Sequence, residues 1–427
     1  MSQGPQNAVP PIPRFLGDMS GASATIVAIA LPVMIGFATL GAETGLWYTL
    51  KRQNQSAADA AAITAAYEVI AGKTDPATEL TPAASEAAAQ NGYSGSPPLV
   101  VHPYTDSIVK NGIAVTLQQS QPGLLASLFL PSVTIVTTAV AAIKVLDNPC
   151  ILALATTATG ADIRASSSLD APNCSIATNS KSINSITVES TVRLVTAATL
   201  VARGEISFAG APIDPAAPPP QFALASRPLI GAPSVTDPYA ARLTHAFLTT
   251  GMPPQCASGP PYPANSQICG DLAIAGALNL APGTYWITDG SLRLQPNALL
   301  TCSSCTVIFT SLNSSGGAVG NVQIPNGATV TLQAPHSGMF TGLLMIQDHF
   351  VLPAAASVFE AADNMKLTGL LYFPASTVEF NGNPSPSCTV LVAKQLIIDG
   401  DSGFNTLGCQ TAGLGRLPNV RTVALAE

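Results

Sequence analysis

The stretch ATIVAIALPVMIGFATLGAETGLWYTLKRQNQSAADAAAITAAYEVIAG, residues 24–72, decides how this chain is organised. From Ala22 to Gly41 no side chain is charged, and about twenty such residues let an α-helix cross the hydrocarbon core of a bilayer. The first charge after this run is Glu43, and an aromatic pair follows where interfacial Trp and Tyr are enriched. A single span before a long chain without a second one predicts a membrane-tethered protein with a transmembrane helix at about 22–46.

The alternative for this segment is a cleaved signal peptide, which has a shorter apolar region of roughly 7–15 residues and a basic start. Here the apolar run is longer and its basic start is Arg14 alone, so we expect an uncleaved anchor. All eight cysteines follow the span, between Cys150 and Cys409. An even number on one side predicts disulfides in an oxidising compartment, periplasmic or extracellular. Residues 1–20 would then form a short cytoplasmic segment.

Composition agrees with export and narrows the function. Charged residues make up 10% and aromatic residues 5% of the 427, and Gly and Pro are abundant, which is typical of a turn-rich β protein. The formal net charge of −7 provides no basic patch, so we expect no nucleic-acid partner. No cofactor motif or metal-ligand set is evident, and we expect neither a cofactor nor a metal.

Helical signal ends early in the chain. Residues 53–71 are rich in alanine and contain no Gly or Pro, so the helix leaving the membrane is expected to continue to about Gly72. Ala58 and Ala62 belong to a small-residue face on which another helix can pack closely, and with Glu43 they are the candidate contacts to a helix partner. Good helix propensity with nothing docked is the alternative. Residues 73–148 predict a small α+β segment.

The remainder is rich in short β runs separated by polar turns. We divide it into a first strand-rich part at 149–208, a Pro-rich connector at 209–270 and a second strand-rich part at 271–427. Strands every 8–12 residues are typical of a sandwich or a solenoid. Because the runs are short and uniform, we predict a mainly β fold built as a parallel β-helix-like solenoid, with a β-sandwich as the alternative.

The cysteine spacing predicts local disulfides. Cys150 with Cys174 and Cys388 with Cys409 would each span about one coil, and Cys256 with Cys269 would close a loop of the connector. Cys302 and Cys305 form a C-x-x-C string, which also occurs in zinc and redox sites. The chain has no second C-x-x-C and no suitable histidine pair, so we expect a small structural disulfide there.

Catalysis has weak support in the sequence. A site on neighbouring coils would need clustered carboxylates, or a carboxylate beside a basic residue. The string at 347–349 places an acid beside a histidine, but adjacent strand residues point to opposite faces. His102, His245 and His336 stand isolated in sequence. We therefore expect no enzyme. The candidates for a catalytic cluster are Asp289, Arg293, Asp348, His349, Glu360 and Asp363.

The order of features around the span points to a known family. Gly21 precedes the apolar run, Glu43 lies near its exit, and aromatics, a basic pair, a Gln/Asn-rich step and Ala-Ala-Asp-Ala-Ala-Ala at 57–62 follow. This succession over 21–72 resembles the amino-terminal domain of TadG-like proteins of the Tad (tight adherence, Flp) pilus-assembly system. Six later segments resemble the region that follows in many such proteins: PCILAL (149–154), CSIATNS (174–180), DPYA (237–240), LQAPHSGMFTGLLMIQD (332–348), LTGLLYFPASTVEFNG (367–382) and CTVLVAKQLIIDGDSGF (388–404).

The resemblance implies a single-span component of the bacterial inner membrane, with its amino terminus in the cytoplasm and a periplasmic β-rich scaffold or interaction domain. Its partners would be other Tad/Flp pilus-assembly proteins and the lipid bilayer. Glu43 would then contact a partner within the membrane, or lie solvated among the headgroups. Two other classes remain open: a β-helix carbohydrate-active enzyme, and an envelope adhesin that acts in cell adhesion without pili.

Overall fold

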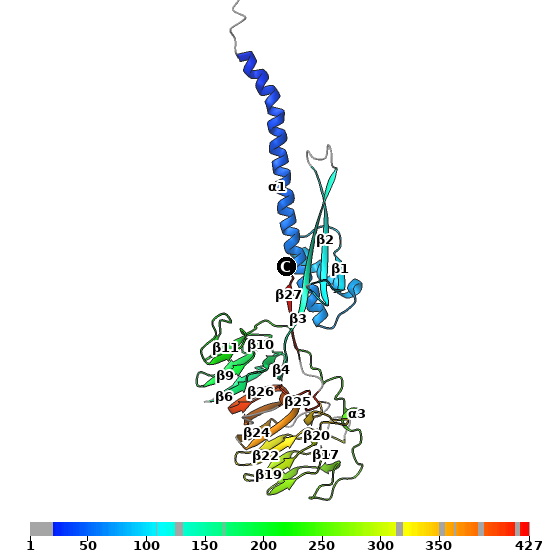
Figure 1. Cartoon of the computed structure of the whole chain (residues 1–427), viewed down its shortest axis with the longest axis vertical. Coiled ribbons are helices and arrows are strands. Elements are labelled where there is room, and N and C mark those ends of the chain that lie inside the picture. Colours follow the sequence, from blue (N-terminus) through cyan, green and yellow to red (C-terminus); the bar gives the residue numbers. More distant parts are fainter. Residues whose placement is uncertain are drawn as a thin grey trace, which may run out of the picture. The chain divides into compact units, whose positions relative to one another are not determined.

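The computed structural model describes residues 20–107, 109–123, 131–164, 167–312, 319–349, 355–362, 364–382, 388–414 and 419–426 (Figure 1). The predicted cytoplasmic segment lies almost entirely outside the described residues. The chain forms two compact units. Unit 1 comprises residues up to Ile143 together with Val423–Glu427, and unit 2 comprises Lys144–Thr422. The protein is mainly β with a long apolar amino-terminal helix, which confirms the predicted fold class.

Unit 1 begins with one continuous helix, α1 (Ser20–Ile70), which contains the predicted span and the alanine-rich stretch after it. The helix ends where Gly72 adopts a positive φ of 99°, a conformation that glycine reaches without strain. Next come a single π-helical turn, η1 (Pro76–Leu80), and α2 (Thr81–Gln90). The side chain of Asp75 caps η1 by accepting hydrogen bonds from the backbone of Ala77 and Thr78.

A four-stranded sheet completes unit 1, in the order β1-β2-β3-β27. β1 pairs with β2 and β2 with β3, both antiparallel. In β3, the alternate residues Ile135, Thr137, Ala139 and Ala141 are buried, as expected for a sheet with one covered face. The strands are β1 (Leu99–Tyr104), β2 (Gly112–Pro122), β3 (Ser132–Asp147) and β27 (Val420–Leu425).

Unit 2 consists of short strands connected by turns. In its first part they are β4 (Pro149–Ala153), β5 (Ala161–Ile163), β6 (Ser168–Ala171), β7 (Ser175–Thr178), β8 (Ile186–Val188), β9 (Leu194–Ala197), β10 (Leu200–Ala202), β11 (Ile206–Phe208), β12 (Ala211–Pro212) and β13 (Phe222–Leu224). After the short helix α3 (His245–Leu248) they are β14 (Ser266–Cys269), β15 (Leu272–Ile274), β16 (Ala277–Asn279), β17 (Gly283–Thr288), β18 (Leu292–Leu294), β19 (Leu299–Cys302), β20 (Cys305–Thr310), β21 (Val322–Ile324), β22 (Thr329–Gln333), β23 (Leu343–Gln347), β24 (Ser357–Ala362), β25 (Met365–Gly382) and β26 (Thr389–Gly403).

Within unit 2 most strands pair with the third strand along the chain. β4 pairs with β7 and β7 with β10, and β14, β17, β20 and β23 pair in the same way. Among the described strands of this unit the pairing is parallel, apart from β11 with β12. Three consecutive short strands thus make one layer, and each layer stacks on the next. Because the strands of a sandwich pair mainly antiparallel, this connectivity favours the predicted solenoid.

The order of the layers differs from the order of the sequence. β26 pairs with β25 on one side and with β4, β5 and β6 on the other. The first strand-rich part therefore stacks directly on the last layer of the second part. Figure 1 shows this: the green strands β9–β11 lie at one end of the stack, the yellow-green β17 and β19 near the other, and the orange-to-red β25 and β26 between them.

The connector returns the chain from one end of this stack to the other. It contributes β12, β13 and α3, and part of it covers the outer face of one sheet. Alternate residues of this sheet belong to two different buried clusters, because successive side chains of a strand point to opposite faces. The inner column contains Tyr285, Val307, Met345, Leu371, Leu391, Ile151, Ile176 and Leu200. The outer column contains Trp286, Ile308, Ile346, Tyr372, Val392, Leu152, Ala177 and Val201.

Candidate functional site

The amino-terminal half of α1 carries an exposed apolar surface. Met34 and Phe37 are 69% and 70% exposed, and most of the large side chains around them are exposed too. A helix packed in a soluble protein would bury one such face. Of the helices in the described part of the chain, α1 is the one long and apolar enough to cross a membrane. Its exposed surface is what a helix surrounded by lipid tails requires.

Glu43 behaves differently from its neighbours on α1. Its residue is 2% exposed, whereas Leu40 and Leu46 are 51% and 43% exposed. Glu43 also takes part in an interaction within this chain. The chain itself therefore covers the carboxylate, and another assembly protein could contact Glu43 only if that cover moved.

Ala58 and Ala62 are fully buried inside unit 1. They belong to a cluster formed by α1, α2 and the inner face of the sheet, in which Ala84, Ile113 and Ala141 are also fully buried. In this structure the helix that packs closely on the small-residue face is α2 of the same chain. Small side chains here allow the close approach of α2 and β2 from the same chain.

The eight cysteines form four disulfides. The bonds join Cys150 to Cys174, Cys256 to Cys269, Cys302 to Cys305 and Cys388 to Cys409. Each pair is one that the sequence spacing predicts, and all four lie in unit 2. In unit 2 the Cys256–Cys269 bond ties the connector to β14, and Cys388–Cys409 ties the start of β26 to the segment that follows it.

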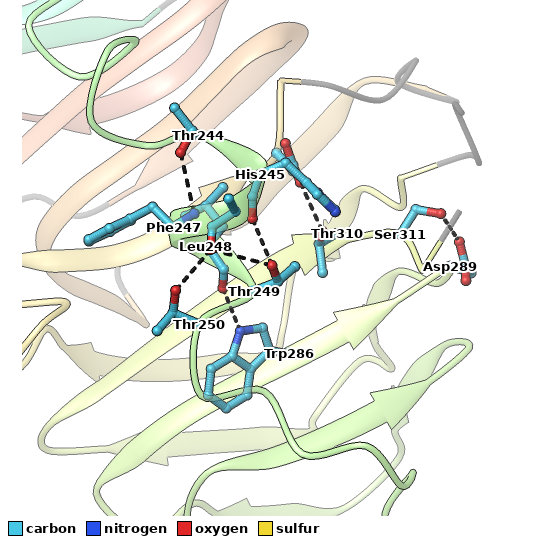
Figure 2. A network of polar contacts seen from close by, with 12 residues as sticks. Thr244, His245, Phe247, Leu248, Thr249, Thr250, Trp286, Asp289, Thr310 and Ser311 are labelled. Atoms are coloured by element: carbon cyan, nitrogen blue, oxygen red, sulfur yellow. Dashed lines mark hydrogen bonds and ion pairs between the residues drawn. The ribbon is translucent and has the colours of Figure 1, made fainter. Parts of the chain in front are cut away.

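Figure 2 shows the polar contacts around α3. The side chain of Thr244 caps this helix by accepting from the backbone N–H of Phe247. His245, its first residue, places Nδ1 2.5 Å from Oδ2 of Asp348, which lies just after β23. The same carboxylate oxygen accepts a hydrogen bond of 2.9 Å from the hydroxyl of Thr310. Asp348 is completely buried, and the side chain of His245 is 26% exposed.

This pairing could not be predicted from sequence distance, because His245 and Asp348 are 103 residues apart. His349, the neighbour considered in the sequence, is exposed instead. A histidine oriented by a buried carboxylate is one half of a nucleophile–base–acid arrangement. In this position the pair joins the connector to the end of β23.

The other catalytic candidates are dispersed. Asp289 accepts a hydrogen bond of 2.5 Å from Ser311, and Nε of Arg293 lies 2.9 Å from Asp271. Burial raises the pKa of Glu360, and the charges of two nearby carboxylates add to that rise. Asp363 lies outside the described residues.

In the described part of the chain no three His, Cys, Asp or Glu side chains are grouped so that they could hold a metal ion.

Comparison with known families places residues 21–68 in the Tad family model, described as Flp pilus-assembly TadE/G-like. The match covers the span and the alanine-rich stretch of α1, and it confirms the resemblance predicted for this segment. The likeness of the six later segments stays a prediction, because the match ends before them. Comparisons with curated proteins and with solved structures gave no match.

Proposed function

We propose that this chain, whose residues 21–68 form a TadE/G-like domain, is a single-span component of Tad/Flp pilus assembly in the bacterial inner membrane. The amino terminus lies in the cytoplasm, and unit 2 acts in the periplasm as a parallel β-helix-like scaffold or interaction domain. Its partners are other pilus-assembly proteins of that membrane and the lipid bilayer.

One observation carries this proposal: the family domain and the anchor are a single helix. α1 runs without interruption from its exposed apolar half into the alanine-rich half that forms the core of unit 1. Any movement or force on the folded unit is therefore transmitted along α1 into the membrane segment, within which Pro32 lacks the N–H for one helical hydrogen bond. Such coupling suits an assembly component better than a protein tethered by a flexible linker.

The disulfides support the periplasmic location. Four bonds in one unit are expected where an oxidising compartment forms and maintains them, and they are rare in the cytosol. Unit 1 contributes no cysteine, which agrees with a segment that leaves the membrane directly.

We also propose that the chain is not an enzyme. Asp289, Arg293 and Asp348 are each engaged with a different partner, and His245 joins the connector to Asp348. If this is correct, Asp348→Asn and His349→Gln should leave pilus formation unchanged in protein that still folds. Loss of pili with either variant, at normal protein abundance, would instead favour an active site in unit 2.

Topology gives the first test. Alkaline phosphatase, which is active only after export, should be active when fused after Glu427 and inactive when fused before Ala22. The opposite pattern would contradict both the orientation and the compartment argument.

The anchor gives the second test. Replacing residues 20–46 by a cleavable signal peptide should release an exported, folded protein and abolish pili. A control chain carries an unrelated single-span anchor in place of residues 20–46. Restored pili in this control would show that tethering alone is sufficient, and absent pili would show that specific contacts of the native span are also required. Normal piliation by the released form would contradict an anchored role.

A further inference from the structure

A cavity of about 520 Å³ opens on unit 2, at the end of the sheet that the connector covers. Its walls come from the turn after α3 at Thr250, the start of β17, the turn before β20 at Ser304, and residues 335–340. This volume falls within the range of small-molecule sites in proteins. The cavity is separate from the His245–Asp348 pair, since neither residue lines it.

The lining of the cavity carries no formal charge. Its polar side chains are those of Asn, Ser and Thr, and the rest are apolar or glycine. The two nearest basic groups are engaged: Arg242 donates to the carbonyl of Met339 at 3.1 Å, and the ring of His336 contacts Gln333 and Thr411. A charged ligand would lose its hydration here without a countercharge, so the lining selects against charge.

Four polar side chains of the lining keep hydrogen-bonding capacity for a ligand. The hydroxyls of Thr284, Ser304 and Ser337 form no hydrogen bond with the described residues. Asn265 accepts from the backbone N–H of Thr284 at 2.9 Å, which leaves its amide NH₂ group as a donor. Each hydroxyl can both donate and accept, so the set can satisfy a ligand rich in hydroxyl groups.

Aromatic side chains form the floor. The rings of Trp286 and Phe340 meet edge to face with centroids 6.4 Å apart, and both residues are buried. The indole N–H of Trp286 donates to the carbonyl of Leu248 at 2.7 Å. The floor is thus rigid, and its one polar group is already satisfied by the protein. Met339, 47% exposed, adds a mobile apolar side chain at the rim.

We propose that this cavity binds a short neutral saccharide. A sugar ring combines an apolar C–H surface with hydroxyls around its edge, which matches a lining that mixes apolar side chains, among them the exposed Met339, with uncharged hydroxyl and amide groups. A peptide strand would need a row of free backbone groups. Two backbone N–H groups of this rim are not free, since Gly283 donates to Ser304 and Thr284 donates to Asn265. The proposal rests on unit 2 alone and does not depend on the pilus role.

The test uses the full chain in a detergent without a sugar headgroup. Maltotriose, cellotriose and chitotriose serve as neutral probes, and trigalacturonate as a charged one. The chain has two tryptophans, so Trp47→Phe makes the fluorescence report on Trp286 alone. At least one neutral trisaccharide should change that fluorescence saturably, with calorimetry giving the same dissociation constant. Trigalacturonate should bind at least about tenfold more weakly.

Ser337→Arg should raise the dissociation constant of the neutral probe at least about tenfold, because the arginine side chain fills the cavity and brings a charge into it. Ser303→Arg is the matched control, because Ser303 is exposed and next to Ser304 but does not line the cavity. Both positions changed are exposed, and circular dichroism should show an unchanged fold. The proposal is overturned if no neutral probe binds, if trigalacturonate binds equally well, or if Ser337→Arg binds like Ser303→Arg.

Discussion

The two units of this chain are stabilised in opposite ways. The core of unit 1 is dominated by alanine: Ala57, Ala61 and Ala65 of α1 are fully buried, like Ala58 and Ala62. This core contains no disulfide. The core of unit 2 is filled by large apolar and aromatic side chains in stacked layers and is crosslinked four times. Unit 1 is held by close backbone approach, and unit 2 by side-chain volume and covalent bonds.

This difference follows from what each unit packs. A helix can lie close to a second helix and a sheet only if its facing side chains are small, so unit 1 tolerates little added volume. The layers of unit 2 enclose a wider interior, which stacked rings fill, and its short strands gain from crosslinks. The comparison predicts opposite sensitivities: unit 2 should be damaged by making side chains smaller, and unit 1 by making them larger.

The largest effect is expected from Phe380→Ala in unit 2. Phe380 is completely buried between Phe359 and Phe404, with ring centroids 5.5 and 4.8 Å away. Losing its ring should lower the free energy of unfolding by about 3–5 kcal/mol, through lost burial and a cavity. Segment-resolved hydrogen exchange should show the loss in unit 2. Leu407→Ala, at a 58% exposed position, is the control and should have little effect.

Removing a long-range disulfide should have the next largest effect. The chain-entropy model gives about 3 kcal/mol for the Cys150–Cys174 bond, with a sequence separation of 24, and about 2 kcal/mol for Cys302–Cys305, with a separation of 3. Double Cys→Ser variants measured by chemical denaturation would test the order. Reductant should destabilise unit 2 and leave hydrogen exchange in unit 1 unchanged; equal destabilisation of both units would contradict the contrast drawn above.

Adding side-chain volume to the core of unit 1 should lower its free energy of unfolding by about 1–3 kcal/mol. Ala58→Leu and Ala62→Leu insert methyl groups where no side-chain atom is accessible to solvent, and they should force α2 and β2 away from α1. Exchange of the β2 and β3 amides should accelerate while unit 2 is unaffected. Ser56→Leu, at an exposed position of the same helix, provides the control. A neutral Ala58→Leu would show that unit 1 is less closely packed than argued.

The smallest effect is expected at an ion pair of unit 2. The hydrogen bond from Arg193 lowers the pKa of Asp401, and the backbone N–H of Ser168 contributes at 2.9 Å. The pair therefore stabilises the fold above the unfolded-state pKa of about 3.9, and this is lost as the pH falls through the lower folded value. Both side chains are more than half exposed, so Asp401→Asn should cost at most about 1 kcal/mol at pH 7.

The pH profile distinguishes this pair from general charge effects. The difference in unfolding free energy between the wild type and Asp401→Asn should shrink towards zero as the pH falls through the lowered pKa of Asp401 in the folded state, below which the carboxyl is protonated in both states. High salt should also reduce it. Glu205→Gln, at an exposed glutamate whose side chain forms no hydrogen bond with the described residues, is the control for removing one surface charge.

Much of the fold could be predicted because it is encoded locally. The uncharged run and the alanine-rich stretch predict one long helix, since helix propensity and hydropathy depend on neighbouring residues alone. The four disulfide pairs were predictable because each closes over at most 24 residues, about one layer of strands. The family domain was recognisable for the same reason, since its motifs lie within 48 consecutive residues, 21–68.

Only the tertiary structure decided which distant segments meet. Nothing local specifies that β26 pairs with β4, so that the first strand-rich part stacks on the last layer of the second, because parallel strands of similar apolar pattern are interchangeable until the whole stack forms. The partner of Ala58 was undetermined because a small-residue face suits a foreign helix and its own sheet equally well. His245 and Asp348 meet for the same physical reason: periodicity determines which way a side chain points, but long-range packing determines what it touches.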